Sequence, residues 1–125
     1  MTIELWMITS LSLLFIKHWY IDFVDQSMEE VTQKGIYGAW LGIRHSLKHA
    51  VGTLVVFGIM GESVIGAIIL AILDGVLHYH IDWAKMNWGN RDITTNAFWA
   101  HLGLDQLAHS LVYLGLVYLV LVNVS

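Results

Sequence analysis

The amino-acid sequence predicts an all-α protein, a four-helix transmembrane bundle built from two similar helical hairpins. Three observations support this prediction. The chain of 125 residues is 57% hydrophobic and only 13% charged, which is too apolar for an ordinary soluble domain of this length. Four long apolar stretches alternate with short polar connections. In each stretch, a histidine lies four residues from an aspartate or from another histidine.

Each apolar stretch is long enough to cross a membrane. At a rise of ~1.5 Å per residue, about 20 helical residues span a hydrocarbon core of ~30 Å. Leu, Ile, Val, Ala and Gly dominate throughout, and strands would have to be far shorter. The predicted helices cover residues 3–26, 38–60, 62–86 and 97–124.

The polar connections contain recognisable helix starts. Ser27 and Glu30 fit a capping box, which predicts a short surface helix in the first connection. Thr95 or Asn96 can cap the last helix. No composition break divides the chain, so residues 1–125 form one predicted transmembrane domain.

A shift of sixty residues aligns the ionisable residues of 1–60 with those of 61–125. Three identities stand out: His18 with His78, Asp22 with Asp82, and His49 with His109. His45 falls on Asp105. Two hairpins of the same topology would be related by a pseudo-twofold axis along the membrane normal. We therefore interpret the chain as two pseudo-repeated hairpins.

These polar residues are expected to meet on one side of the membrane. Side chains four apart share a helix face, and an up-down-up-down bundle places the four polar half-helices at the same end. A buried charge in a bilayer needs a partner or a metal. Imidazole and carboxylate ligands suit zinc first, or manganese or iron, and eight ligands suit two divalent ions. The predicted ligands are His18, Asp22, His45, His49, His78, Asp82, Asp105 and His109.

Such a site favours hydrolysis of a phosphoester. Two metal ions ~3.5–4 Å apart activate a bound water and stabilise displacement at phosphorus. Asp105, like Asp22 or Asp82, is placed to bridge the ions, and Arg44 with Lys48 could hold a phosphate. We therefore expect catalytic roles for Arg44, Lys48 and Asp105. The expected substrate is a lipid head group or a small cytosolic phosphate compound.

Four further ionisable residues have weaker patterns. Asp74 lies two turns deeper than Asp82 and is expected to support the ligands or to carry protons. Asp25 is either a solvated residue at a helix end or a metal ligand. His101 is equally expected to be a ligand or a residue outside the site. His80 lies off the shared face and is expected at the membrane interface.

Charge sets the expected location and partners. All six Lys and Arg residues fall on the side of the polar cluster, so the positive-inside rule places that side in the cytoplasm and both termini outside. Lys34, Lys85 and Arg91 are the clearest of these indicators. The net charge of −4 and the lack of a basic run exclude nucleic-acid binding. The lipid bilayer is the expected partner, and small residues on the second helix permit a homo-oligomer.

The motifs also resemble a known family. The segment H-W-Y-I-D-F-V-D-Q begins at His18, and H-x3-D-W-x-K begins at His78. D-Q-x2-H begins at Asp105. Together these resemble the domain-of-unknown-function family 3307 of small bacterial and phage membrane proteins. That family is similar in pattern to inner-membrane proteins called membrane-bound metal-dependent hydrolases. The resemblance implies a bacterial inner-membrane location and places Gln26 and Gln106 beside the ligands.

Three other functions remain open from the sequence. A redox di-iron protein is disfavoured because such bundles use glutamate ligands, and no glutamate lies within the four clusters. A transporter or proton channel could use the His and Asp residues as a relay. A phage-encoded membrane-interaction protein could use the metal only to hold the helices of the bundle together.

Overall fold

The computed structural model describes residues 1–124, and all regular secondary structure in that range is helical. The last residue of the predicted domain, Ser125, lies outside the described part. The all-α prediction with four long helices is confirmed. The elements are α1 (Ile3–Trp19), the π-helical η1 (Tyr20–Asp25), the short α2 (Met28–Gln33), α3 (Trp40–Ile59), α4 (Val64–Trp88) and α5 (Asn96–Val124).

Helix boundaries follow local capping chemistry. The capping box predicted before α2 is present, since the Ser27 side chain accepts from the Glu30 amide and the Glu30 side chain accepts from the Ser27 amide. The Thr95 hydroxyl accepts from the Phe98 amide and caps α5, as predicted. Gly61 follows the end of α3 and lies in the turn to α4. Its φ of 85° falls in the left-handed region that favours glycine.

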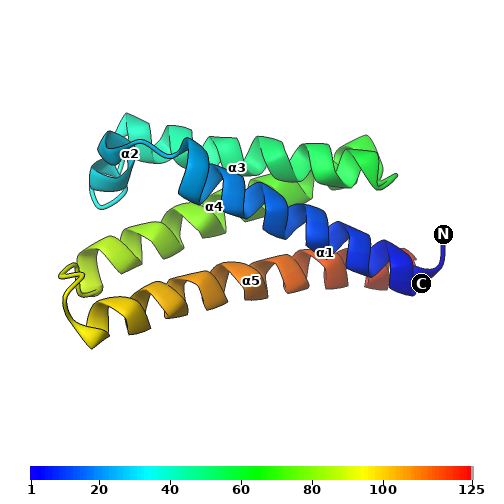
Figure 1. Ribbon diagram of the computed structural model, residues 1–125. Helices are drawn as coiled ribbons and strands as arrows, with labels where there is room; N and C mark the ends of the chain where they lie inside the picture. The colour runs from blue at the N-terminus through cyan, green and yellow to red at the C-terminus, as the bar shows by residue number, and fades with distance from the viewer. Residues whose placement is uncertain (125) are drawn as a thin grey trace.

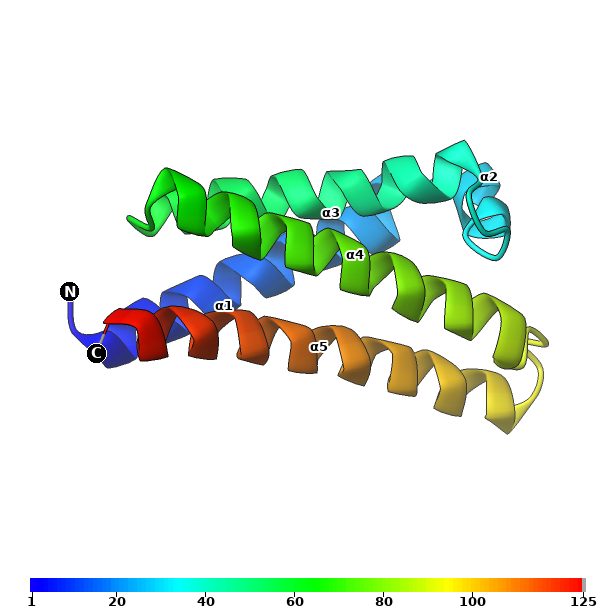
Figure 2. The ribbon, with the colours of Figure 1, turned by 180° about the vertical axis from the view of Figure 1, so that it is seen from behind.

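The helices run up and down, so the two chain ends lie together. Figure 1 shows both termini at one end of the bundle, and α2 and the α4–α5 connection at the other end. The view from behind shows α4 crossing obliquely, beside α3 near their hairpin and beside α5 near the α4–α5 connection (Figure 2). α2 lies at the end where α3 and α4 diverge. The connection after α2 bridges them, because Asn87 of α4 donates to the carbonyl of Gly35.

The interior changes character along the bundle axis. The half near the termini is a hydrophobic core that includes Leu14, Phe57, Leu70 and Val117. The half near α2 buries histidines, aspartates and lysines instead. This division agrees with the expected placement of the polar half-helices at one end.

The outer surface is largely apolar. Exposed hydrophobic side chains line the outside of α4, for example Ile69 and Ile72, and of α5, for example Leu111 and Leu114. α4 and α5 are long and apolar enough to cross a membrane, and only 28% and 33% of their most apolar segments are buried. α1 has only 17 residues before the hydrogen bonding changes to the π pattern, and α3 carries several ionisable residues. Two potential spans are therefore shown by length and composition, out of the four expected.

Candidate metal centre

All eight predicted ligands converge at the α2 end of the bundle, and each is at most 8% exposed. Their ligand atoms fall into three groups, within each of which all atoms lie within 4.8 Å of one another. The first group contains Asp22, His45, His49 and His78. The second contains His18, His78 and His109, and the third contains Asp82, Asp105 and His109. His78 and His109 each belong to two groups, so the three groups form one continuous cluster able to hold metal.

Asp22 is the centre of the first group. Its Oδ1 lies 2.9 Å from Nε2 of His45, 2.8 Å from Nε2 of His49 and 3.7 Å from Nε2 of His78. Its Oδ2 lies 3.1 Å from Nε2 of His18. Asp22 belongs to the π-helical η1, and π segments are frequent at functional sites.

Asp82 occupies the equivalent place in the second half. Its Oδ2 lies 3.1 Å from Nε2 of His78, one turn earlier, which matches the 3.1 Å contact of His18 with Asp22. Its Oδ1 lies 3.2 Å from Nε2 of His109, the counterpart of the His49 contact. The repeated residues therefore make repeated contacts, as expected for two related hairpins.

The arrangement fits a cation-binding site. The Nε2 atoms of His45 and His78 face each other at 3.3 Å, and each also faces a carboxylate. Two imidazole lone pairs repel at that distance unless a proton or a cation lies between them. The Nδ1 atoms of His49 and His78 are buried without a hydrogen-bond partner among residues 1–124. Their hydrogen bonds therefore run through Nε2, the atom that points to the carboxylates, while the two rings stack on each other with centroids 3.5 Å apart.

Tyr113 and Gln106 hold His18. The Tyr113 hydroxyl lies 2.9 Å from Nδ1 of His18, and Oε1 of Gln106 lies 3.0 Å from Nε2. A partner on the outer ring nitrogen fixes the orientation of a ligand histidine. Gln106 also donates to Oδ2 of Asp105, in keeping with the resemblance. Gln26 instead donates to the backbone carbonyl of Asp22.

Lys17 and Asp74 form a buried ion pair between the cluster and the apolar core. Nζ of Lys17 donates to Oδ2 of Asp74 at 2.7 Å and to the Thr53 hydroxyl at 2.9 Å. It also donates to the backbone carbonyl of His49. Thr53 donates to Asp74 in turn. Asp74 therefore supports the ligand helices through Lys17 and contacts none of the eight candidate ligands by a hydrogen bond.

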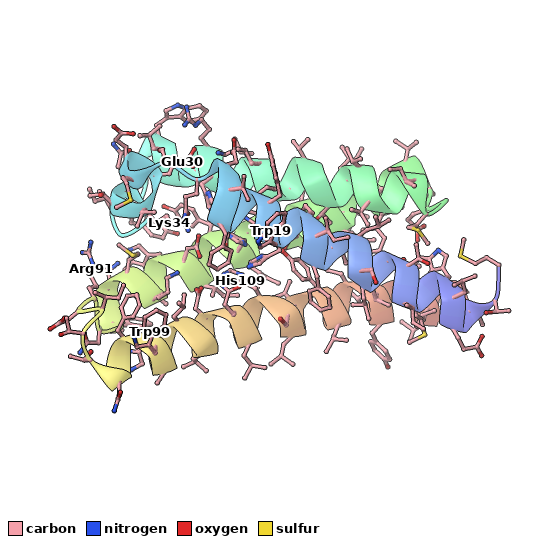
Figure 3. The ribbon with its side chains drawn as sticks, viewed as in Figure 1. Trp19, Glu30, Lys34, Arg91, Trp99 and His109 are labelled. Atoms are coloured by element: carbon pink, nitrogen blue, oxygen red, sulfur yellow. The ribbon has the colours of Figure 1, made fainter. Side chains whose placement is uncertain are left out.

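Two more lysines bind candidate ligands from the opposite side. Nζ of Lys34 lies 2.9 Å from Oδ2 of Asp82, and Nζ of Lys85 lies 3.0 Å from Oδ2 of Asp105. Figure 3 shows Lys34 directed into the bundle between α2 and α4, with His109 further along the interior. The charge pattern of the sequence predicts that both lysines mark the cytoplasmic side of the membrane. They are paired inside the bundle, so Arg91 alone remains of the three clearest indicators.

The predicted phosphate-binding residues Arg44 and Lys48 are engaged by Glu30. Nη2 of Arg44 lies 2.8 Å from Oε1 of Glu30, as does Nζ of Lys48, which also binds Asp25. Burial by itself raises the pKa of the Glu30 carboxyl, but the hydrogen bonds from Lys48 and Arg44 outweigh it and bring the pKa to about 2. Oε2 of Glu30 lies 3.6 Å from Nδ1 of His45. A phosphate at Arg44 and Lys48 would have to displace this carboxylate.

The remaining candidates lie outside the three ligand groups. His80 is exposed, pairs with the Tyr37 hydroxyl and packs against the rings of Tyr37 and Tyr79, as expected at an interface. His101 accepts from the backbone amide of Asn90 through Nδ1. Asp25 is exposed and pairs with Lys48, which favours its interpretation as a helix end.

Sequence reasoning missed the buried roles of Glu30, Lys17 and Lys34. Glu30 was read only as half of a capping box, yet its side chain is fully buried against His45 and two cations. Lys17 adjoins His18 and was read only as a charge on the cytoplasmic side. The available signal was the cost of burying four aspartates, Asp22, Asp74, Asp82 and Asp105, since buried carboxylates require partners of opposite charge.

Comparison with protein families adds one result. The family model described as protein of unknown function (DUF3307) matches residues 10–125. No curated protein and no solved structure matches the chain, so no named relative supports the expected similarity to metal-dependent hydrolases. Because the match covers nearly the whole chain, including all eight clustered histidines and aspartates, the protein belongs to the DUF3307 family.

Proposed function

We propose that this protein is an integral membrane, metal-dependent hydrolase of phosphoesters, with its site at the cytoplasmic end of a four-span bundle. The observation that carries the proposal is the continuous cluster of eight buried histidine and aspartate side chains. Nε2 atoms of His45, His49 and His78 converge within 3.7 Å of a single oxygen, Oδ1 of Asp22, and convergence of imidazole nitrogens and carboxylate oxygens on one point is what a bound cation requires.

The cluster divides naturally into two metal positions. Asp22, His45 and His49 would hold one ion, and Asp82, Asp105 and His109 would hold the other, with His18 and His78 between them. Two bound ions supply an activated water and Lewis-acid stabilisation of a phosphoryl group. Lys34 forms an ion pair with Asp82, and Lys85 donates a charge-assisted hydrogen bond to Asp105.

Burial and surface character support a membrane location. The exposed faces of the long helices are hydrophobic and the ionisable groups lie inside, which reverses the arrangement of a soluble bundle. α1 continues through η1 to Asp25, so its helical length exceeds that of α1 alone. We therefore propose four spans, although only α4 and α5 meet the criteria of length and composition by themselves.

A transmembrane relay is less well supported than a hydrolase. Asp74, the deepest ionisable group of the cluster, is bound by Lys17 and Thr53. Beyond it, the described core is formed by apolar side chains such as Phe57 and Leu70. A proton reaching Asp74 therefore finds no acidic, histidine or lysine side chain ahead of it among the described residues of that core.

The proposal is tested first by metal content. Protein purified in detergent without chelators should contain about two zinc, manganese or iron ions per chain by mass spectrometry, as eight ligands allow. A His49→Ala, His109→Ala double variant should lose them. His80→Ala is the matched control, because His80 lies on the same helix as His78 but outside the cluster. Folded wild-type protein without stoichiometric metal would overturn the proposal.

Catalysis is tested separately. Release of phosphate from p-nitrophenyl phosphate and from phosphatidic acid should be detectable for wild type and lost in Asp82→Asn, with His80→Ala unchanged. Bound metal without hydrolysis of either substrate would instead indicate a metal that only holds the bundle together.

A further inference from the structure

A pocket of about 350 Å³ lies at the α2 end of the bundle, between the η1–α2 connection, the end of α4 and the start of α5. Three cations line it, Lys34, Lys85 and Arg91, and no carboxylate is among its described lining residues. Figure 3 shows Arg91 at this end of the molecule, near Lys34 and Trp99. A pocket with this lining attracts anions.

The two lysines connect this pocket to the candidate metal centre. The ammonium group of Lys34 contacts Asp82 at 2.9 Å, and that of Lys85 contacts Asp105 at 3.0 Å. Both aspartates belong to the ligand group that includes His109. An anion bound by these lysines would therefore lie next to the candidate ligands. Arg44 and Lys48 line neither this pocket nor the groove beside it. Lys34 and Lys85 line the pocket even though each is paired with an aspartate.

An apolar groove of about 330 Å³ adjoins the cationic pocket. It runs between α4 and α5 and shares Lys85 and His101 with the pocket. Its other walls include Ile81, Ala84 and Ala108. The groove reaches Asp105 from the outer surface of the bundle, where Leu104 is 63% exposed. Hydrocarbon can thus approach the site from the side while an anion occupies the cationic pocket.

We propose that the substrate is an amphiphilic phosphate, a membrane lipid whose phosphate head lies between Lys34 and Lys85 and whose hydrocarbon chain lies in the α4–α5 groove. Exposed Trp88 and Trp99 mark this end as the level of the head groups. A soluble phosphate compound would use the cations but leave the adjoining apolar groove without an occupant. The role of this lipid as a substrate rests on the proposed hydrolase function, but the binding of the lipid is tested independently of catalysis.

The test is native mass spectrometry of the detergent-purified protein titrated with phosphatidic acid, with phosphatidylcholine as the control lipid. Wild type should retain phosphatidic acid in preference to phosphatidylcholine. Lys85→Gln should weaken that binding about tenfold or more, as expected for loss of one charge-assisted hydrogen bond. His80→Ala, at an exposed position outside the pocket and the ligand groups, should change the binding less than about twofold.

The role of the groove is tested by a substitution that fills it with a larger side chain. Ala108→Trp fills it without changing charge and should weaken phosphatidic acid binding about tenfold, the loss expected when a hydrocarbon segment no longer fits. Leu107→Trp, on the exposed neighbouring position outside the groove, should bind like wild type. Glycerol 3-phosphate, which has the head but not the chain, should bind more weakly than phosphatidic acid and be insensitive to Ala108→Trp.

Three results would overturn the inference: equal binding of both lipids, equal losses in Lys85→Gln and His80→Ala, or glycerol 3-phosphate binding as tightly as phosphatidic acid. The last would assign a soluble substrate. Each titration is repeated after treatment with EDTA. Selective lipid binding by a protein that holds no metal would support the pocket while contradicting the hydrolase, so the two proposals fail separately.

Discussion

At the scale of single residues, buried charges determine how the site is built. Asp22 is surrounded by histidines, whereas Asp74, Asp82 and Asp105 each have a lysine partner. An isolated carboxylate at this depth would be costly, and removing one partner of a buried pair leaves that cost uncompensated. The lysines are thus as much a part of the site as the candidate ligands.

The Lys17–Asp74 pair offers a direct test of this view. Lys17→Met leaves the buried Asp74 carboxylate without its cation and should lower the free energy of unfolding by about 3–5 kcal/mol. The measurement is denaturant-induced unfolding in detergent micelles, followed by circular dichroism.

The double variant Lys17→Met, Asp74→Leu is the control for loss of the lysine side chain itself. Removing both charges should recover most of the lost stability, because no unpaired charge remains buried. Equal destabilisation in the single and double variants would show that packing of the lysine stem, and not its charge, matters at this position.

At the scale of elements, the short α2 completes the polar end of the bundle. It brings Glu30 to His45 and is followed directly by Lys34, which reaches Asp82 on α4. Its approach to α3 is close because Gly42 has no side chain. A Cβ at Gly42 would lie 3.2 Å from the Gln33 carbonyl oxygen and 3.3 Å from Cα of Lys34. Both are backbone atoms, which cannot move independently of α2.

Gly42→Ala is therefore expected to displace α2. The predicted cost is about 1–3 kcal/mol of stability, typical of overpacking, together with faster hydrogen exchange in Met28–Gln33. Gly58→Ala is the matched control on the same helix, since nothing lies within 4 Å of its added Cβ. It should be neutral or stabilising by up to about 1 kcal/mol. Unchanged exchange in α2 of the Gly42 variant would argue against this close contact.

At the scale of the whole molecule, polarity is separated along the bundle axis. The apolar core lies near the termini, the ionisable cluster lies near α2, and hydrophobic side chains cover the outside. In the proposed four-span arrangement, both termini would lie on one side of the membrane and the candidate metal centre would lie nearer the other.

The proposed topology is testable because the chain contains no cysteine. Glu29→Cys, at an exposed position of α2, should react with a membrane-impermeant maleimide only from the cytoplasmic side. Glu4→Cys, exposed near the start of α1, should react only from the opposite side. Labelling of both positions from the same side of intact membranes would rule out the four-span arrangement.

By itself, the sequence determined the four long helices and the set of eight converging side chains. Helical periodicity is local, and the spacing of four between residues such as His18 and Asp22 already places them on one face. Up-and-down connectivity then brings the polar half-helices together. Their role as metal ligands remains a prediction.

Only the tertiary structure decided which charge meets which. Lys17 pairs with Asp74 and Lys34 with Asp82 across helices, and Glu30 engages Arg44 and Lys48, which had been expected to bind phosphate. Such pairs depend on distances of a few ångströms between elements far apart in the sequence, and they leave no periodic pattern in it. For the same reason, the cationic pocket and its adjoining groove became visible only once α2, α4 and α5 were placed relative to one another.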